Sequence, residues 1–164
     1  LRAAAGGGVG ARESPGPVRP AARGAGQADW VIGQAQGEAA PRTMALVVAS
    51  IAHGQVVTPR LVEGAATQPA KADKPLTAAE ADMLSQMMRA VVTEGTATFL
   101  KDVPGLPVEA KTGTAEYGTD QPPRLHSWMI AIHGDLAVVA FVEDGGTGAA
   151  TAGPILEHFL RTDG

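Results

Sequence analysis

The 164-residue sequence has no cysteine, so it contains neither a disulfide bond nor a thiolate ligand for a metal ion. That absence does not fix the compartment, because a chain without cysteine folds in either redox environment. Aromatic residues are also scarce, at 4%, so a folded core has to be built mainly from aliphatic side chains. No apolar run approaches the roughly 18 residues that a membrane-spanning helix needs. The sequence therefore excludes a disulfide scaffold, a thiolate zinc module and a transmembrane helix within these residues.

Positive charge is unevenly distributed. The first 30 residues hold four arginines and two acidic residues, which leaves nine basic and 15 acidic residues, a net charge of −6, for the remainder. A body of that sign repels phosphate backbones, so nucleic acid is not an expected partner.

The first 29 residues differ in kind from the rest. They consist mostly of Ala, Gly, Pro and Arg with few large side chains, so they bury too little apolar surface to offset their ordering entropy. We predict a disordered low-complexity segment at residues 1–29 and a folded unit at residues 30–162. The scattered arginines leave open a basic tail that binds an acidic surface.

Two helices are predicted in the first half of the folded unit. Pro41 suits a first helical position, apolar residues follow at helical spacing, and Gly54 is a natural stop. The second helix begins with a capping-box pattern, Thr77 followed three residues later by Glu80, and Gly95 ends it. The expected buried stripe of this helix consists of Leu84, Met87, Met88 and Val91. The methionines Met83, Met87 and Met88 are expected to serve as adaptable core packing.

From Val108 onward the apolar period changes to that of strands. The segments "VEAKTGTAEYG", "HSWMIAIHG" and "LAVVAFVEDGG" predict three consecutive strands, with a close hairpin at Gly134 and Asp135. "AATAGPILEHFLRTD" predicts a last helix. Helices, an antiparallel run and a covering helix together indicate an α/β layered arrangement.

Common cofactor and metal patterns are not met. The glycine-rich turn "EDGGTGAATAGP" lies between a strand and a helix but matches neither nucleotide fingerprint, so a turn that lets the last helix pack closely is the better interpretation. The histidines lack metal-ligand spacing, and we expect most of them at the surface or in turns: His53, His126, His133 and His158. We predict no cofactor and no metal.

The stretch "KTGTAE" stands on the first of the three strands, and an exposed edge strand with a lysine and threonines would by itself be unremarkable. Upstream, however, the chain has a Gly-Gln segment, "PRTMALVVASIAHG" and "TPRLV", in that order. This set resembles the C-terminal half of the transpeptidase domain of class B penicillin-binding proteins, from about Val31 to Leu160. The Lys-Thr-Gly box is a recognised motif of these enzymes.

The resemblance implies a partial β-lactamase/transpeptidase-like fold, with antiparallel strands flanked by helices and a disordered N-terminal tail. It also implies that the box strand forms one wall of a cleft that binds a peptidoglycan stem peptide or a β-lactam. Lys111 would attract the substrate carboxylate, and Thr114 would offer its hydroxyl to that same carboxylate. Thr112 matches the second position of the box and counts among its substrate-binding residues. Gly113 would let the acyl group lie against the strand, and the Thr114 N–H would be an oxyanion-hole donor.

The acylating residues of that family have no counterpart here. No serine is followed by Lys at the third position or by Asn at the second, so we assign no nucleophile and no general base; the serines are Ser14, Ser50, Ser85 and Ser127. Two functions remain open: a piece of a serine D,D-transpeptidase that is inactive alone, and a non-catalytic peptide- or partner-binding module of the same fold. The family further implies a place at the outer face of the cytoplasmic membrane, with other cell-wall synthesis proteins as possible partners.

Overall fold

The computed structural model describes residues 2–3, 39–59 and 75–162. Helix α2 spans Pro41–His53, α3 spans Ala78–Thr93, and a short 3-10 helix, η1, spans Thr98–Leu100. Strands β2 (Glu109–Tyr117), β3 (Arg124–His133) and β4 (Leu136–Gly145) follow, and α4 (Gly148–Thr162) ends the chain. A two-residue strand, β1 (Arg2–Ala3), pairs in parallel with β4.

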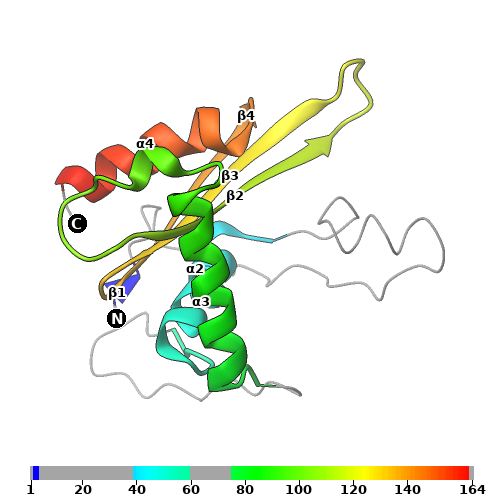
Figure 1. Cartoon of the computed structure of the whole chain (residues 1–164). Helices are drawn as coiled ribbons and strands as arrows, with labels where there is room; N and C mark the ends of the chain where they lie inside the picture. The colour runs from blue at the N-terminus through cyan, green and yellow to red at the C-terminus, as the bar shows by residue number, and fades with distance from the viewer. Residues whose placement is uncertain (1, 4–38, 60–74, 163–164) are drawn as a thin grey trace.

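The strands form one sheet in the order β1-β4-β3-β2, in which β2, β3 and β4 are antiparallel neighbours (Figure 1). A two-residue turn at Gly134, whose φ of +60° suits glycine, joins β3 to β4 and pairs His133 with Leu136. The predicted arrangement of antiparallel strands flanked by helices is confirmed. Because β2 is the last strand in this order, its outer edge has no strand partner among the described residues.

Local signals explain both helix starts. Pro41 begins α2, and Gly54 closes it in the left-handed conformation at φ +71°. At the start of α3 the Thr77 N–H donates to Glu80 Oε2 at 2.9 Å, and the Glu80 N–H donates to Thr77 Oγ1 at 3.3 Å. The predicted capping box is therefore present.

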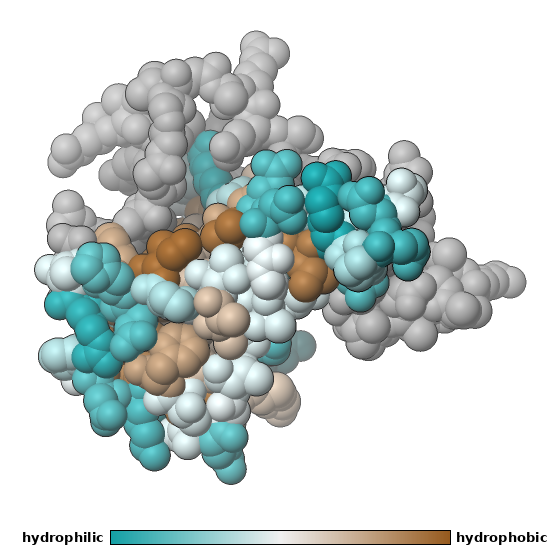
Figure 2. Space-filling model, turned by 90° about the horizontal axis from the view of Figure 1, so that it is seen from above, coloured by the Kyte–Doolittle hydropathy of each residue, from teal (hydrophilic) through white to brown (hydrophobic). Residues whose placement is uncertain are grey.

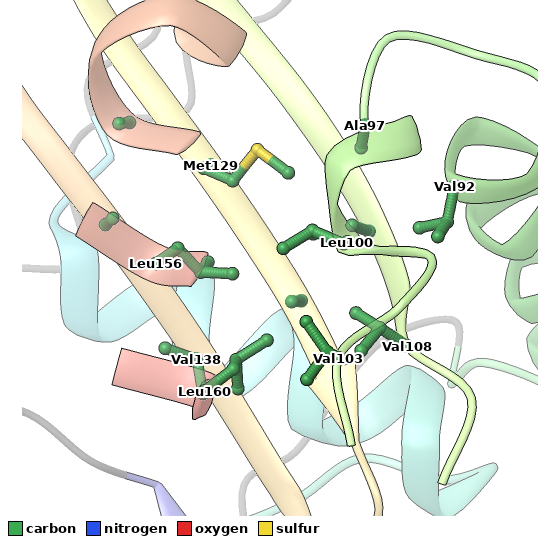
Figure 3. Packing of buried hydrophobic residues seen from close by; sticks show 13 residues of the cluster. Val92, Ala97, Leu100, Val103, Val108, Met129, Val138, Leu156 and Leu160 are labelled. Atoms are coloured by element: carbon green, nitrogen blue, oxygen red, sulfur yellow. The ribbon is translucent and has the colours of Figure 1, made fainter. Parts of the chain in front are cut away.

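Helices cover both faces of the sheet. The larger core lies between the sheet and α4, where Met129 of β3 meets Leu156 and Leu160 (Figure 3). The smaller core lies on the opposite face, where Ile132 of β3 joins Val48 of α2. Alternation of side chains along β3 explains how one strand serves both cores.

Helix α3 contributes to both cores, through Val92 to the larger and Met88 to the smaller. It also holds the start of β2 directly: Arg89 Nη1 donates to Val108 O at 2.7 Å, and Ser85 Oγ donates to Glu109 Oε2 at 2.7 Å. Helix α3 therefore crosses the sheet at its β2 edge, next to the predicted site.

The expected buried stripe of α3 is partly wrong. Met88 is buried at 6% exposure, but Met83 and Met87 are 58% and 53% exposed. The buried residues of α3 are Ala81, Met88 and Val92, which share a face turned toward the sheet edge. The apolar residues of α3 cover more of the helix surface than its contacts with the rest of the fold bury, so Met83, Leu84 and Met87 remain at the surface.

Figure 2 shows apolar residues in the middle of one face of the molecule, bordered by polar ones. Over the whole surface of the described part of the chain, the exposed large apolar side chains are Val47, Met83, Leu84, Met87, Leu106, Phe141 and Ile155. No helix among the described residues is long and apolar enough to cross a membrane.

Other predictions fall outside the described residues. These include the disorder of residues 1–29, apart from the Arg2–Ala3 pairing, the start of the folded unit near Trp30, and most of the "TPRLV" segment. The two-part division at residue 30 stays a prediction.

Candidate functional site: the outer edge of strand β2

The box residues Lys111 to Thr114 lie in the middle of the edge strand β2. Side chains alternate along a strand, and Ala110 belongs to the core beneath α4, so Thr112 and Thr114 share that face. Lys111 and Gly113 lie on the opposite face. The side chains of Lys111 and of the two threonines thus leave opposite faces of β2, and the hydrogen bond from Lys111 Nζ to Thr112 O brings the ammonium back to the backbone of the same strand.

Lys111 is exposed and pairs across the sheet with Ile130. Its Nζ donates to its neighbour's carbonyl, Thr112 O, at 2.5 Å. The ion pairs within the described residues are Asp120–Arg124 and Glu157–Arg161, so the ammonium has no acidic partner there. This charge is available to an anion that approaches the edge of β2.

Both threonine hydroxyls are held by other elements. Thr112 Oγ1 lies 2.9 Å from Thr96 Oγ1, in the turn between α3 and η1. Thr114 Oγ1 accepts a hydrogen bond from the Gly148 N–H, the first residue of α4, at 3.0 Å. Sequence reasoning missed both partners; the only local signals are a Gly-Thr pair after a helix end and the small residues at the start of α4.

The two glycines of the site permit close packing. A Cβ on Gly113 would lie 3.2 Å from Trp128 Cβ on β3, so a side chain at this position would crowd that of Trp128. A Cβ on Gly148 would lie 2.4 Å from Trp128 O and 2.5 Å from Gly113 O. Only a residue without a side chain can therefore start α4 against the box strand.

An aromatic array continues from the box along the Lys111 face of the sheet. Trp128 contacts Phe141 with ring centroids 4.3 Å apart, and His126 stacks on Tyr117 at 3.8 Å. The Arg124 guanidinium covers the Tyr117 ring at 4.7 Å. The pKa of Tyr117 is raised above its ordinary value. Burial is the largest cause, Arg124 opposes it and nearby carboxylates add to it, so the phenol is neutral at pH 7. These rings stiffen the hairpin that extends from the box strand (Figure 1).

The prediction places most of the histidines at the surface or in turns, and one of the four is buried. His133 is 6% exposed, and its Nε2 has no hydrogen-bond partner within the described residues. A Cβ on Gly105 would lie 3.1 Å from that nitrogen, so the segment after η1 closes over the ring. No group of three acidic or histidine side chains among the described residues could hold a metal ion.

The described serines are all engaged in structural hydrogen bonds. Ser50 Oγ donates to Leu46 O at 2.7 Å, and Ser127 Oγ donates to Gly146 O at 2.6 Å from a fully buried position. Ser85 Oγ donates to Glu109 Oε2. None of these partners is a lysine or histidine that could act as a base for acyl transfer. Ser14 lies outside the described residues.

Known proteins resemble this chain in sequence and in fold. The family model described as the penicillin binding protein transpeptidase domain matches residues 11–161, a range that begins before the start near Val31 that the resemblance suggested. The peptidoglycan D,D-transpeptidase PbpA of Mycolicibacterium smegmatis is 34% identical over 146 residues, which cover 76% of this chain and 29% of that protein. The chain thus spans less than a third of this relative.

Two solved structures share the fold at lower identity. Pseudomonas aeruginosa PBP2, determined in complex with WCK 5153, is 23% identical with a TM-score of 0.62, over 82% of this chain and 32% of that one. The D,D-transpeptidase domain of a peptidoglycan glycosyltransferase from Eggerthella lenta is 23% identical with a TM-score of 0.52, over 76% and 32%. The fold, the box on an edge strand and the family match agree: this chain belongs to the penicillin binding protein transpeptidase domain family.

Proposed function

We propose that this chain supplies the β2 wall of the active site of a peptidoglycan D,D-transpeptidase that also binds β-lactams. The observation that carries the proposal is the exposed ammonium of Lys111 in the middle of an edge strand, which has no acidic partner among the described residues. The family match and the relationship to PbpA give that geometry its chemical context.

In this proposal Lys111 attracts the carboxylate that ends a stem peptide or is attached to a β-lactam. Thr112 and Thr114 orient that carboxylate, and Gly113 lets the acyl group lie against the strand. The Thr114 backbone N–H donates to the oxyanion that forms at the attacked carbonyl; a donor of this kind lowers the barrier by about 3–4 kcal/mol.

Acyl transfer also requires an activated serine and a base, and the 164 residues contain no Ser-x-x-Lys and no Ser-x-Asn. The wall therefore acts only together with residues that this sequence does not supply. The engagement of the described serines in structural hydrogen bonds favours one second candidate, a non-catalytic module that uses the same wall to bind a peptide or a protein partner.

A hybrid protein tests the first candidate. In the hybrid this chain replaces the matching segment of M. smegmatis PbpA, so that the relative provides the rest of the protein. We expect the hybrid to be labelled by a fluorescent penicillin. Lys111→Ala should slow labelling at least tenfold, because a charge-assisted hydrogen bond contributes about 1.5–3 kcal/mol.

Lys101→Ala is the matched control, since Lys101 is an exposed lysine of the η1 loop. A folded hybrid that is not labelled, or one in which Lys111→Ala and Lys101→Ala are labelled equally fast, would refute the proposal.

The proposal also places the intact protein at the outer face of the cytoplasmic membrane, in contact with other cell-wall synthesis proteins.

A further inference from the structure

The hydroxyl groups of Thr96 and Thr112 meet at 2.9 Å, although the two residues belong to different elements. Thr96 lies in the turn between α3 and η1, whereas Thr112 is the second box residue on β2. Either hydroxyl can donate, and each also has acceptor capacity left over. This side-chain hydrogen bond joins the turn after α3 to the box strand.

The backbone fixes the position of Thr96. A Cβ on Gly95 would lie 2.8 Å from the Val91 backbone, so the turn passes tightly over the last turn of α3. Ala97 is fully buried in the larger core, and its N–H donates to Val91 O at 3.0 Å. With both neighbours anchored, Thr96 presents its hydroxyl to β2 from a rigid frame while its side chain stays exposed.

Thr112 by itself lacks such a frame. Its side chain is half-buried on an edge strand, and strands allow a threonine more than one χ1 rotamer. A bond from a fixed neighbour selects the rotamer that places Oγ1 beside Thr96. If Thr96 donates, the proton of Thr112 remains to be given to a ligand, and hydrogen bonds in such a chain strengthen one another.

We propose that Thr96 is a positioning residue for Thr112: its hydroxyl donates to Thr112 Oγ1 and directs the Thr112 O–H toward the ligand carboxylate. This inference rests on the proposed function, in which Thr112 faces that carboxylate. It assigns to the turn after α3 a part in recognition that its sequence alone does not indicate.

The positioning step is tested on the full chain by NMR. Three-bond couplings to the Thr112 methyl carbon report its χ1 rotamer in the wild type and in Thr96→Val, Thr96→Ser and Thr98→Val. We expect one rotamer in the wild type, in Thr96→Ser, which keeps the hydroxyl, and in Thr98→Val, an exposed control two residues away. Thr96→Val should show rotamer averaging at Thr112.

A single, unchanged Thr112 rotamer in a folded Thr96→Val variant would overturn the proposal. Should Thr96→Val disturb the amide spectrum, Thr96→Ala takes its place, because it removes the hydroxyl without adding a methyl group to the turn. Thr96→Ala should then show rotamer averaging at Thr112, and a single, unchanged Thr112 rotamer in that variant would overturn the proposal.

The consequence for recognition is tested in the PbpA hybrid with a fluorescent penicillin. Thr96→Val should weaken the initial non-covalent binding about three- to tenfold, the size of one hydrogen bond, and should change the acylation rate of the bound complex less. Thr96→Ser should restore binding. Combined with Thr112→Ala, Thr96→Val should add nothing further, since both changes interrupt one hydrogen-bond chain.

The outcomes separate the two proposals. If Lys111→Ala and Thr112→Ala slow labelling but Thr96→Val does not, the role of Thr96 is refuted and the proposed function stands. If none of the three changes matters, the proposed function fails, and the inference fails with it.

Discussion

The first N–H of the last helix, at Gly148, donates to the hydroxyl of Thr114 on the box strand at 3.0 Å. Thirty-four residues separate the two in the sequence. The bond exists because α4 starts directly on the backbone of β2 and β3, where Gly113 O and Trp128 O leave no space for a side chain. The site therefore depends on the C-terminal helix as well as on its own strand.

Replacing Gly148 with alanine should separate the helix from the box strand. The new Cβ would meet backbone atoms at 2.4 and 2.5 Å, which cannot move as the end of a side chain can. We expect a destabilisation of about 1–3 kcal/mol, typical of overpacking, measured by urea unfolding. Ala150→Ser, at an exposed position of the same helix, should change the unfolding free energy little. Equal stabilities for the two variants would contradict the close packing at Gly148.

Neighbouring methionines of α3 should respond differently to the same truncation. Met88→Ala should cost about 2–5 kcal/mol because Met88 is buried against the smaller core. Met87→Ala should stay within about 0.5 kcal/mol, since more than half of that side chain is exposed. Denaturant unfolding of both variants decides the matter, and a larger loss for Met87 would reverse the assignment of the buried face.

The exposed flank of α3 should make the isolated chain prone to association. Its apolar residues Met83, Leu84 and Met87 are contiguous at helical spacing, and the outer edge of β2 has no strand partner among the described residues. We expect concentration-dependent association by analytical ultracentrifugation, and the double change Met83→Gln, Met87→Gln should reduce it. A sharp, reversible thermal transition from a monomer of the wild-type chain would count against this expectation.

The isolated chain should not be acylated. The described serines donate to Leu46 O, Glu109 and Gly146 O, and none of them has a basic partner. We therefore expect no covalent labelling of the chain by a fluorescent penicillin, in contrast to the PbpA hybrid. Stoichiometric labelling that mass spectrometry maps to a single serine would show that an activated nucleophile exists within these residues.

The capping box of α3 should depend on pH. Hydrogen bonds from the Thr77 side chain and backbone lower the pKa of Glu80 below its ordinary value of 4.5. A lowered pKa in the folded state contributes stability above the pKa of the unfolded chain, and this contribution is lost as the pH falls through the folded pKa. NMR titration of the Glu80 carboxyl should show the shift in the wild type and its reduction in Thr77→Ala. Identical titration curves would exclude the capping interaction.

The sequence was most informative where a residue type acts locally. Pro41, Gly54 and the Thr77–Glu80 pair start or stop helices through their own hydrogen bonds and dihedral angles, and Gly134 allows its turn by itself. The Lys-Thr-Gly box was recognisable from its order and its strand context. Such features depend on few neighbours, so a single sequence predicts them.

Features that depend on distant packing could not be predicted. The apolar pattern of α3 includes residues 83, 84, 87 and 88, and only its position across the β2 edge decides which of them are buried. The burial of His133 requires the segment at Gly105 to fold back over the sheet. The contact of Thr96 with Thr112 joins a turn to a strand, and no periodicity reports such a pair.

The crossing of α3 over the start of β2 has a consequence for how far the sheet can grow. Arg89 donates to the Val108 carbonyl and Ser85 donates to the Glu109 carboxylate, so α3 covers the beginning of β2. The part of the edge that no described strand pairs with runs from there to Tyr117. At about 3.3 Å per residue, an edge of this kind accommodates only a short extended peptide. Helix α3 thus limits, at this end of the strand, the length of an extended peptide that can lie along β2.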